Sequence, residues 1–318
     1  MIPSRNTMKK LNFVLSLITQ DNDYQIEQAA SAEETARRLG LDLKIVFADN
    51  DAIQQSQQIL QFIQSKSAAL PDGIILEPAG GTALPQVAHA AATAGIGWVV
   101  LNRHTDYLHE LRRTNRVPIF AVSSDSVEVG RIQARQLAAF LPNGGTALYL
   151  QGPSDSTTAT QRTDGMHASK PANIQLKMMK AQWTEASAYK AISAWLRLST
   201  SQQSHVDVIA AQNDAMASGA RKAFQEVFDQ DARDRWLALP YMGCDGVPNS
   251  GQAWVKSGLL AATVITPPLA GQALDMLAGA LQTGALPPEL TLVAPSSFPT
   301  MEALTRSQKA RFAIASKI

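Results

Sequence analysis

Polar side chains suited to ligand binding come directly after two apolar stretches of the chain. Arg103 follows residues 98–101, and Asn213 follows residues 208–211. Open α/β sheets place their ligand contacts beyond the carboxyl ends of the strands. Guanidinium and amide groups can each bind two neighbouring ligand atoms, with charge assistance from the arginine. We therefore expect Arg103 and Asn213 to contact the same polar ligand from the two halves of the protein.

Motifs that would support catalysis on such a scaffold are missing from the sequence. There is no G-x-S-x-G elbow, no P-loop and no G-x-G-x-x-G after an apolar run. The five histidines lack the spacing of metal ligands, and the single cysteine, Cys244, lacks a partnered histidine. We expect no catalytic residue, no metal and no cofactor.

Composition restricts the class of protein further. The 318 residues are 45% hydrophobic and 17% charged, which suits a globular chain with room for two domains. A formal net charge of +1 gives no reason to expect nucleic acid or an anionic membrane as partner. One cysteine excludes an intramolecular disulfide, and no apolar run approaches the roughly 18 residues of a membrane span.

The first apolar run resembles the front of a signal peptide, because two lysines precede residues 11–18. A polar stretch follows it, however, and no small-residue cleavage site is present there. We interpret residues 11–18 as the first buried strand. The chain is accordingly expected to be soluble and to show no export signal.

These side chains must be positioned by a regular alternation of elements. Apolar runs at residues 12–18, 43–48, 73–76 and 98–101 alternate with helical patterns, of which the first ends at Gly40. Short apolar strands separated by helices are typical of a parallel sheet covered on both faces. The first part of the chain is thus expected to be a doubly wound α/β lobe.

The same alternation restarts farther along the chain and predicts a second lobe. Its strands are expected at residues 147–150, 176–181, 208–211 and 241–243, and a last helix at residues 269–281 precedes a proline-rich tail. We expect strands near residues 121–123, 264–267 and 290–293 to form a three-strand hinge. One lobe would comprise residues 1–121 and 266–291, the other 122–265 and 292–318, with a ligand cleft between them.

Four motifs at strand ends resemble those of a known family. They are AQNDAMA at residues 211–217, GCDG at 243–246, LAAT at 260–263 and LNR at 101–103. Their order and spacing resemble the ribose-type sugar-binding proteins, which are type I periplasmic binding proteins of ABC transporters. Lactose-repressor-type effector domains share that fold. The resemblance covers about residues 11–293.

The resemblance implies a set of ligand-binding residues. Arginines and amides in this family bind sugar hydroxyls, and aromatic rings stack on the C–H face of the sugar. The matching positions are Asn22, Tyr24, Glu77, Asn102, Arg103, Arg162, Trp183, Asn213, Asp245 and Thr266.

Several positions depart from the family pattern. Asn102 replaces the usual aspartate of the LDR motif, Cys244 replaces an aromatic residue, and Thr266 stands where ribose binders carry a glutamine. Glu77 supplies a carboxylate where relatives often have an amide. These differences keep the expected fold but argue against simple ribose as the ligand.

Charge balance among the same residues predicts the class of ligand. Arg103 and Arg162 are matched in number by Glu77 and Asp245. We therefore expect a small neutral sugar or polyol rather than a phosphate or a dicarboxylate.

Structural roles are the alternatives for individual residues. Arg103 can pair with a surface carboxylate, Trp183 can be ordinary core packing, and Asp245 can simply form a turn. Asp214 is the expected cap of the helix after residues 208–211, with Asn213 as the alternative.

Two functional hypotheses follow. The first is a monomeric solute-binding protein that closes on its ligand by hinge motion and is recognised by a membrane permease. The second is the effector-sensing domain of a transcriptional regulator or of a sensor-kinase system. The resemblance implies the periplasm, whereas a complete chain without an export signal would be cytoplasmic. About ten residues precede the first strand, too few for a DNA-binding segment, so we expect no nucleic acid to bind this chain.

Overall fold

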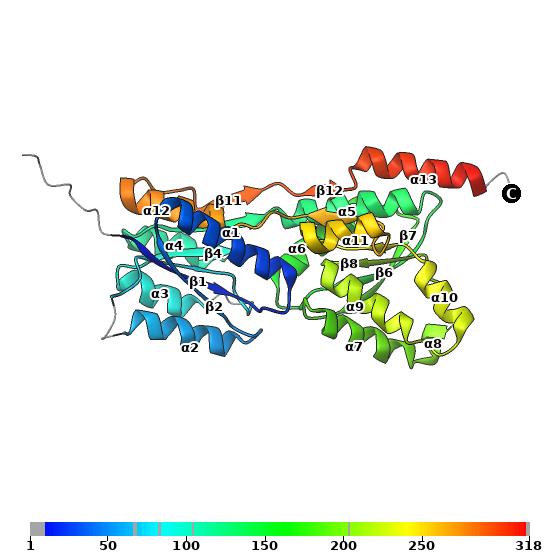
Figure 1. Cartoon of the computed structure of the whole chain (residues 1–318), viewed down its shortest axis with the longest axis horizontal. Coiled ribbons are helices and arrows are strands. Elements are labelled where there is room, and N and C mark those ends of the chain that lie inside the picture. The colour runs from blue at the N-terminus through cyan, green and yellow to red at the C-terminus, as the bar shows by residue number, and fades with distance from the viewer. Residues whose placement is uncertain (1–9, 66–68, 82–83, 104, 203, 316–318) are drawn as a thin grey trace, which may run out of the picture. The chain divides into compact units, whose positions relative to one another are not determined.

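Two compact units make up the chain in a computed structural model that describes residues 10–65, 69–81, 84–103, 105–202 and 204–315 (Figure 1). The N-terminal unit comprises residues up to Gln20 together with Gln25–Ser123 and Pro268–Thr291. The C-terminal unit comprises Asp21–Tyr24, Ser124–Pro267 and residues from Leu292 onward. The short segment Asp21–Tyr24 therefore packs with the C-terminal unit, although the residues on both sides of it belong to the other unit.

A six-stranded sheet forms the centre of the N-terminal unit, in the order β11-β5-β4-β3-β1-β2. The pairs β1–β2, β1–β3, β3–β4 and β4–β5 are all parallel. The strands are β1 (Asn12–Leu17), β2 (Asp42–Phe47), β3 (Gly73–Leu76), β4 (Gly97–Leu101), β5 (Ile119–Ser124) and β11 (Leu290–Val293). The expected parallel α/β sheet is thus confirmed for this unit.

Both faces of this sheet are covered by helices, which explains why its strands are almost continuously apolar. The row Val14, Ile74, Trp98 and Ile119, paired across four strands, packs in one core with α2 (Ala52–Ile63), α3 (Pro85–Thr93) and α4 (Tyr107–Thr114). The opposite face is covered by α1 (Asp23–Leu39) and α12 (Ala270–Thr283), as Figure 1 shows.

The C-terminal unit repeats this plan with a four-stranded parallel sheet in the order β7-β6-β8-β9. Its strands are β6 (Gly145–Gln151), β7 (Ile174–Lys180), β8 (Val208–Ala211) and β9 (Tyr241–Met242). One face packs against α5 (Ser126–Phe140) and α6 (Thr157–Ser169). The other packs against α7 (Glu185–Leu196), α9 (Asp214–Gln225) and α10 (Gln230–Ala238), where Phe224 stacks on Trp236 with 4.6 Å between ring centroids.

Smaller elements complete this unit. The turn η1 (Pro248–Gln252) leads into α11 (Ala253–Ser257), and α8 (Ser199–Gln202) follows α7. A two-stranded antiparallel sheet joins β10 (Thr263–Ile265) to β12 (Ser296–Phe298). The proline-rich tail also contains a helix that the sequence analysis did not predict, α13 (Met301–Ala315), in which Leu304 is buried against the core.

Apart from the short segment Asp21–Tyr24, the chain passes between the units at residues 123–124, 267–268 and 291–292. β5 and β11 extend across the first and third of these points. The middle passage differs from the expected strand, because β10 already ends at Ile265 and the passage occurs at Pro267 and Pro268. Neither proline has a backbone N–H to donate to a strand partner.

No helix in the described part of the chain combines the length and apolar character needed to span a membrane.

Two glycines allow α5 and α6 to approach closely. A Cβ at Gly130 of α5 would lie 2.0 Å from the carbonyl oxygen of Arg162, and a Cβ at Gly165 of α6 would lie 2.0 Å from that of Val127. Any larger residue must therefore push the helices apart. The contact between Gly130 and the Arg162 carbonyl therefore fixes the position of the Arg162 backbone. Arg162 is one of the predicted ligand residues.

Replacing one of these glycines gives a test of the packing. Gly130→Ala is expected to lower the free energy of unfolding by about 1–3 kcal/mol, because the new methyl group meets backbone rather than a flexible side chain. The matched control is Gly279→Ala in α12, where no atom lies within 4 Å of the new Cβ. There the gain in helix propensity should raise stability by about 0.5–1 kcal/mol. Urea unfolding of both variants checks this, and equal shifts would contradict the close-packing account.

Candidate functional site

Three of the predicted ligand residues adopt left-handed backbone conformations within three residues of the end of a strand. Their φ angles are 53° at Asn102, 63° at Trp183 and 99° at Asp245. A non-glycine residue in this region costs on the order of 1–3 kcal/mol, and such strain gathers at functional sites. For a residue as bulky as tryptophan the conformation is a true outlier. The backbone thus marks these strand ends as candidate binding positions.

In the N-terminal unit, the predicted residues Glu77, Asn102 and Arg103 form one buried cluster. Glu77 follows β3, and its Oε1 accepts a hydrogen bond from Asn102 Nδ2 at 3.2 Å. Arg103 donates from Nη1 to the carbonyl oxygen of Asn102 at 3.3 Å. Because the end of β3 lies beside the end of β4, parallel pairing brings these side chains together.

Burial raises the pKa of the Glu77 carboxyl above its usual value. Hydrogen bonds from Gln25, Asn102 and Gln28 and the charge of Arg103 act in the opposite direction and favour the carboxylate. The cluster therefore holds a buried acidic group that is matched by a guanidinium and several amides.

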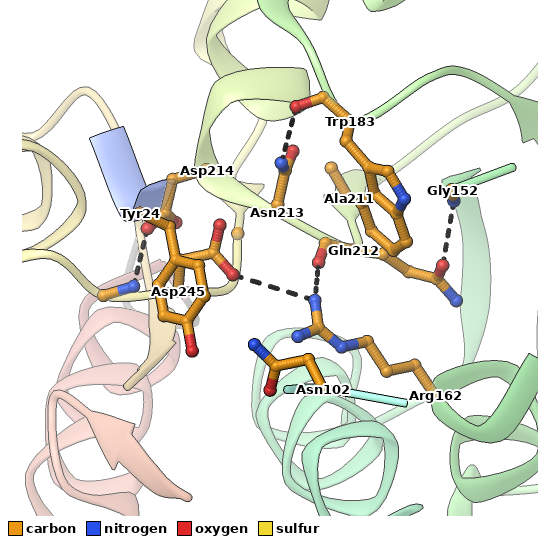
Figure 2. Close-up of polar contacts among 12 residues, drawn as sticks. Tyr24, Asn102, Gly152, Arg162, Trp183, Ala211, Gln212, Asn213, Asp214 and Asp245 are labelled. Atoms are coloured by element: carbon orange, nitrogen blue, oxygen red, sulfur yellow. Dashed lines mark hydrogen bonds and ion pairs between the residues drawn. The ribbon is translucent and has the colours of Figure 1, made fainter. Parts of the chain in front are cut away.

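Arg162 is the centre of the predicted set in the C-terminal unit (Figure 2). Its buried guanidinium donates from Nη1 to the carbonyl oxygen of Gln212 and lies 3.8 Å from Asp245 Oδ1. Its carbon atom Cζ lies 5.6 Å from the centroid of the Trp183 ring. Nε is buried and has no hydrogen-bond partner within the described parts of the chain.

The half-buried indole of Trp183 rests on a glycine. A Cβ at Gly152 would lie 2.2 Å from Cζ2 of the ring, so any larger residue would displace it. The Gly152 N–H in turn donates to Oε1 of the buried Gln212 at 2.9 Å. Gln212 was not among the predicted residues, although its backbone carbonyl contacts Arg162 and its side chain contacts Gly152 beneath the Trp183 ring.

Asn213 uses both ends of its amide inside the unit. Oδ1 caps α9 by accepting from Met216 N at 2.8 Å, and Nδ2 donates to the carbonyl oxygen of Trp183 at 2.8 Å. Asn22 donates to the same oxygen at 3.0 Å. The helix cap is thus Asn213, and the expectation that Asp214 caps α9 is wrong.

Asp214 instead lies buried in a cage of glycines. Oδ1 accepts from Thr263 Oγ1 at 2.7 Å, and Oδ2 accepts from Gly246 N at 2.8 Å. A Cβ at Gly243 or at Gly251 would lie 2.0 Å from one of the two carboxyl oxygens. The carboxyl therefore positions the loop after β9, which carries Asp245.

The remaining predicted residues adjoin that loop. Tyr24 donates from its hydroxyl to the carbonyl oxygen of Pro267 at 3.1 Å. Thr266 donates its backbone N–H to the carbonyl oxygen of Asp245 at 3.0 Å. Its buried Oγ1 has no hydrogen-bond partner among the residues described. Asn22, Tyr24 and Asp245 also line one small cavity of about 10 Å³.

A larger cavity of about 650 Å³ opens between α7, α9 and α10, and none of the predicted residues lines it. Its two carboxylates already accept hydrogen bonds, Glu226 from Tyr189 and Asp229 from the backbone of Ala232. Across the described ranges there is no group of three or more His, Cys, Asp or Glu side chains placed to hold a metal ion.

The Asp214 cage predicts a pH-dependent stability. Burial, followed by the nearby charge of Asp245, raises the pKa of Asp214 well above its usual value. The folded state therefore binds a proton more tightly than the unfolded state. This contribution to stability is present below about pH 4, the unfolded pKa, and is lost as pH rises through the folded pKa.

Asp214→Asn removes this proton linkage with little change in shape. In urea unfolding between pH 4 and 8, the stability of the unmodified chain relative to the variant should fall as pH rises. Asp275→Asn, at an exposed carboxylate of α12, is the control for a surface charge. If the difference in free energy of unfolding between the unmodified chain and Asp214→Asn stays constant between pH 4 and 8, Asp214 is not the titrating group.

Known proteins share both the sequence pattern and the fold. The ribose import binding protein of Salmonella typhimurium is 25% identical over 265 residues, which cover 83% of this chain and 82% of that protein. An ABC transporter periplasmic solute-binding protein of Actinobacillus succinogenes, solved with bound D-allose, has a TM-score of 0.77. It is 23% identical, and the match covers 93% of this chain and all of that one.

The fructose-binding periplasmic domain of a hybrid two-component system is also similar, with a TM-score of 0.75 and 20% identity over 96% of this chain and 97% of that one. Both structural likenesses confirm the expected fold, two α/β lobes of the type I periplasmic binding proteins. The family model described as the periplasmic binding protein domain matches residues 13–285. The chain therefore belongs to the periplasmic binding protein domain family.

Proposed function

We propose that this chain is a solute-binding protein that binds a small neutral sugar or polyol without changing it chemically. The observation that carries the proposal is the matching of buried charge within each unit. The charge of Arg103 acts on Glu77, and Arg162 forms an ion pair with Asp245. Since each guanidinium already has a carboxylate, a phosphate or carboxylate ligand would leave an acidic group unmatched. Neutral hydroxyl groups require no such change.

The proposed contacts use hydrogen-bonding atoms that the chain itself leaves available. Arg162 Nε and Thr266 Oγ1 are buried and lack partners within the described residues, and ligand hydroxyls would satisfy both. The ring of Trp183 would stack on the C–H face of the sugar. Asn213, whose amide is already engaged on both ends, would contribute less. The full proposed set is Asn22, Tyr24, Glu77, Asn102, Arg103, Arg162, Trp183, Asn213, Asp245 and Thr266.

The family and its relatives support the wider role. We propose that the chain is a monomer of the periplasm, that its two lobes close on the ligand by hinge motion, and that a transporter permease recognises the closed form. The proposed lobes divide near residues 121, 266 and 291. Neither catalysis nor a cofactor is part of this proposal.

A sensory role is the second candidate. It is favoured by the likeness to the fructose-binding periplasmic domain of a two-component system. The two roles differ in the partner rather than in the ligand. Neighbouring genes for a permease and its ATPase support transport, and a neighbouring sensor kinase supports signalling.

A ligand screen tests the binding function. Thermal shift with D-ribose, D-allose, D-fructose and myo-inositol, followed by calorimetric titration, is expected to identify at least one neutral ligand. The corresponding sugar phosphates should bind at least tenfold more weakly, which is about 1.4 kcal/mol. Tight binding of a phosphate, with no shift from any neutral sugar or polyol, would contradict the proposal.

Substitutions then separate binding from capping. Arg103→Ala removes a charged donor, so affinity for the identified ligand should fall by the equivalent of roughly 1.5–3 kcal/mol. Asn213→Ala should affect affinity less but lower the free energy of unfolding by about 1 kcal/mol, because α9 loses its cap. Arg135→Ala, at an exposed ion pair with Glu128, is the control. Calorimetry and urea unfolding measure both quantities, and unchanged affinity in Arg103→Ala would show that this arginine is structural.

A further inference from the structure

A buried glutamine in the N-terminal unit uses both ends of its side-chain amide to contact two other elements. Gln28 lies in α1 and has no exposed surface. Its Oε1 accepts from the backbone N–H groups of Leu269 at 2.6 Å and Ala270 at 2.8 Å. Its Nε2 donates to Glu77 Oε2 at 3.1 Å. One amide therefore joins the start of α12 to the carboxylate at the end of β3.

The acceptor side of Gln28 holds the chain where it re-enters the unit. Pro267 is the last residue of the preceding segment, and Pro268 is the first to belong to the N-terminal unit. Leu269 is the cap residue of α12, and its own side chain makes no capping hydrogen bond. The first N–H groups of a helix need an outside partner, which Gln28 supplies from α1.

The donor side of Gln28 leads to the proposed ligand residues. Glu77 accepts from Gln28 on one oxygen and from Asn102 on the other. Asn102 has a left-handed backbone, and its carbonyl oxygen accepts from Arg103. A continuous series of hydrogen bonds thus runs from the start of α12 through Gln28, Glu77 and Asn102 to Arg103.

Neither isosteric nor apolar substitutes can replace this amide. A leucine would leave two backbone N–H groups without partners in a buried environment and would remove one of the hydrogen bonds to the Glu77 carboxylate. A glutamate would keep the acceptor but place a second carboxylate against Glu77. A side chain that accepts on one side and donates on the other is needed, and glutamine at position 28 meets this requirement.

We propose that Gln28 is a positioning residue that fixes Glu77, and through it Asn102 and Arg103, relative to residues 268–270 at the start of α12. This inference rests on the proposed function for its effect on ligand affinity, because Glu77, Asn102 and Arg103 belong to the proposed contact set. Gln28 itself touches no ligand in this account.

Exchanging the two side chains is the decisive experiment. Gln28→Glu and Glu77→Gln are made singly and together, and unfolding is measured in urea without ligand. In the double variant the carboxylate at position 28 accepts from Leu269, Ala270 and the new amide at position 77. Along the series from Leu269 to Asn102, donors and acceptors are then matched again, with one carboxylate and one amide as in the unmodified chain. We expect the unfolding equilibrium constant of the double variant to be at least tenfold smaller than the value predicted by combining the effects of the two single substitutions.

A matched control uses another buried glutamine. Gln133 in α5 donates to the carbonyl oxygens of Ala211 and Gly243, not to a carboxylate. Gln133→Glu should destabilise the chain, and adding Glu77→Gln should change stability additively, because the two sites share no partner. If Gln133→Glu and Glu77→Gln together were more stable than their single effects predict by the same factor, the gain in stability of the exchanged variant would not be specific to Gln28.

Affinity for D-ribose and myo-inositol, measured by calorimetry on the same variants, tests the positioning role. Gln28→Glu should weaken binding of the better probe at least tenfold in the unmodified chain, and by much less when it is made in the Glu77→Gln variant. Coupling in stability without coupling in affinity, or coupling below twofold, overturns the inference. If the unmodified chain binds neither probe while the stability coupling persists, the hydrogen-bond link is supported and the proposed function is contradicted for these ligands.

Discussion

Burying a charge is costly unless an opposite charge or several hydrogen bonds match it, and both units of this chain bury a guanidinium. Arg162 forms an ion pair with Asp245, and the charge of Arg103 acts on the buried Glu77 carboxyl of the same unit. The arginines can therefore stay in place whether or not a ligand is bound. In the account proposed here, this internal matching is what makes neutral hydroxyl groups the natural ligand atoms.

The matched charges need rigid support, and each unit supplies it differently. In the C-terminal unit, glycines at 243 and 251 leave room for the Asp214 carboxyl, which accepts a hydrogen bond from Gly246 N and so holds the loop bearing Asp245. In the N-terminal unit, amides surround Glu77 and connect it to α1 and β4. Asn102 and Asp245 themselves have left-handed backbone conformations. The cost of that strain is offset by the hydrogen bonds around it.

Much of the fold could be predicted from the sequence, because buried parallel strands are short apolar runs between helices. β8 spans Val208–Ala211, the same residues as the predicted strand. Helix α13 was missed because the prolines before it were interpreted as part of an irregular tail. Asp214 was expected to cap a helix because its sequence context suits a cap. Its actual burial depends on glycines far along the chain, which local sequence cannot reveal. Gln28 and Gln212 were missed for the same reason, since their partners are distant in sequence.

The central claim, that each buried arginine is matched by a carboxylate of its own unit so that the ligand is neutral, is tested most directly by a crystal structure of the liganded chain. The account predicts ligand hydroxyl oxygens within hydrogen-bond distance of Arg103 and Arg162, with Glu77 and Asp245 still beside their arginines. A phosphate or carboxylate group of the ligand bound to either arginine, with its acidic partner displaced, would contradict it.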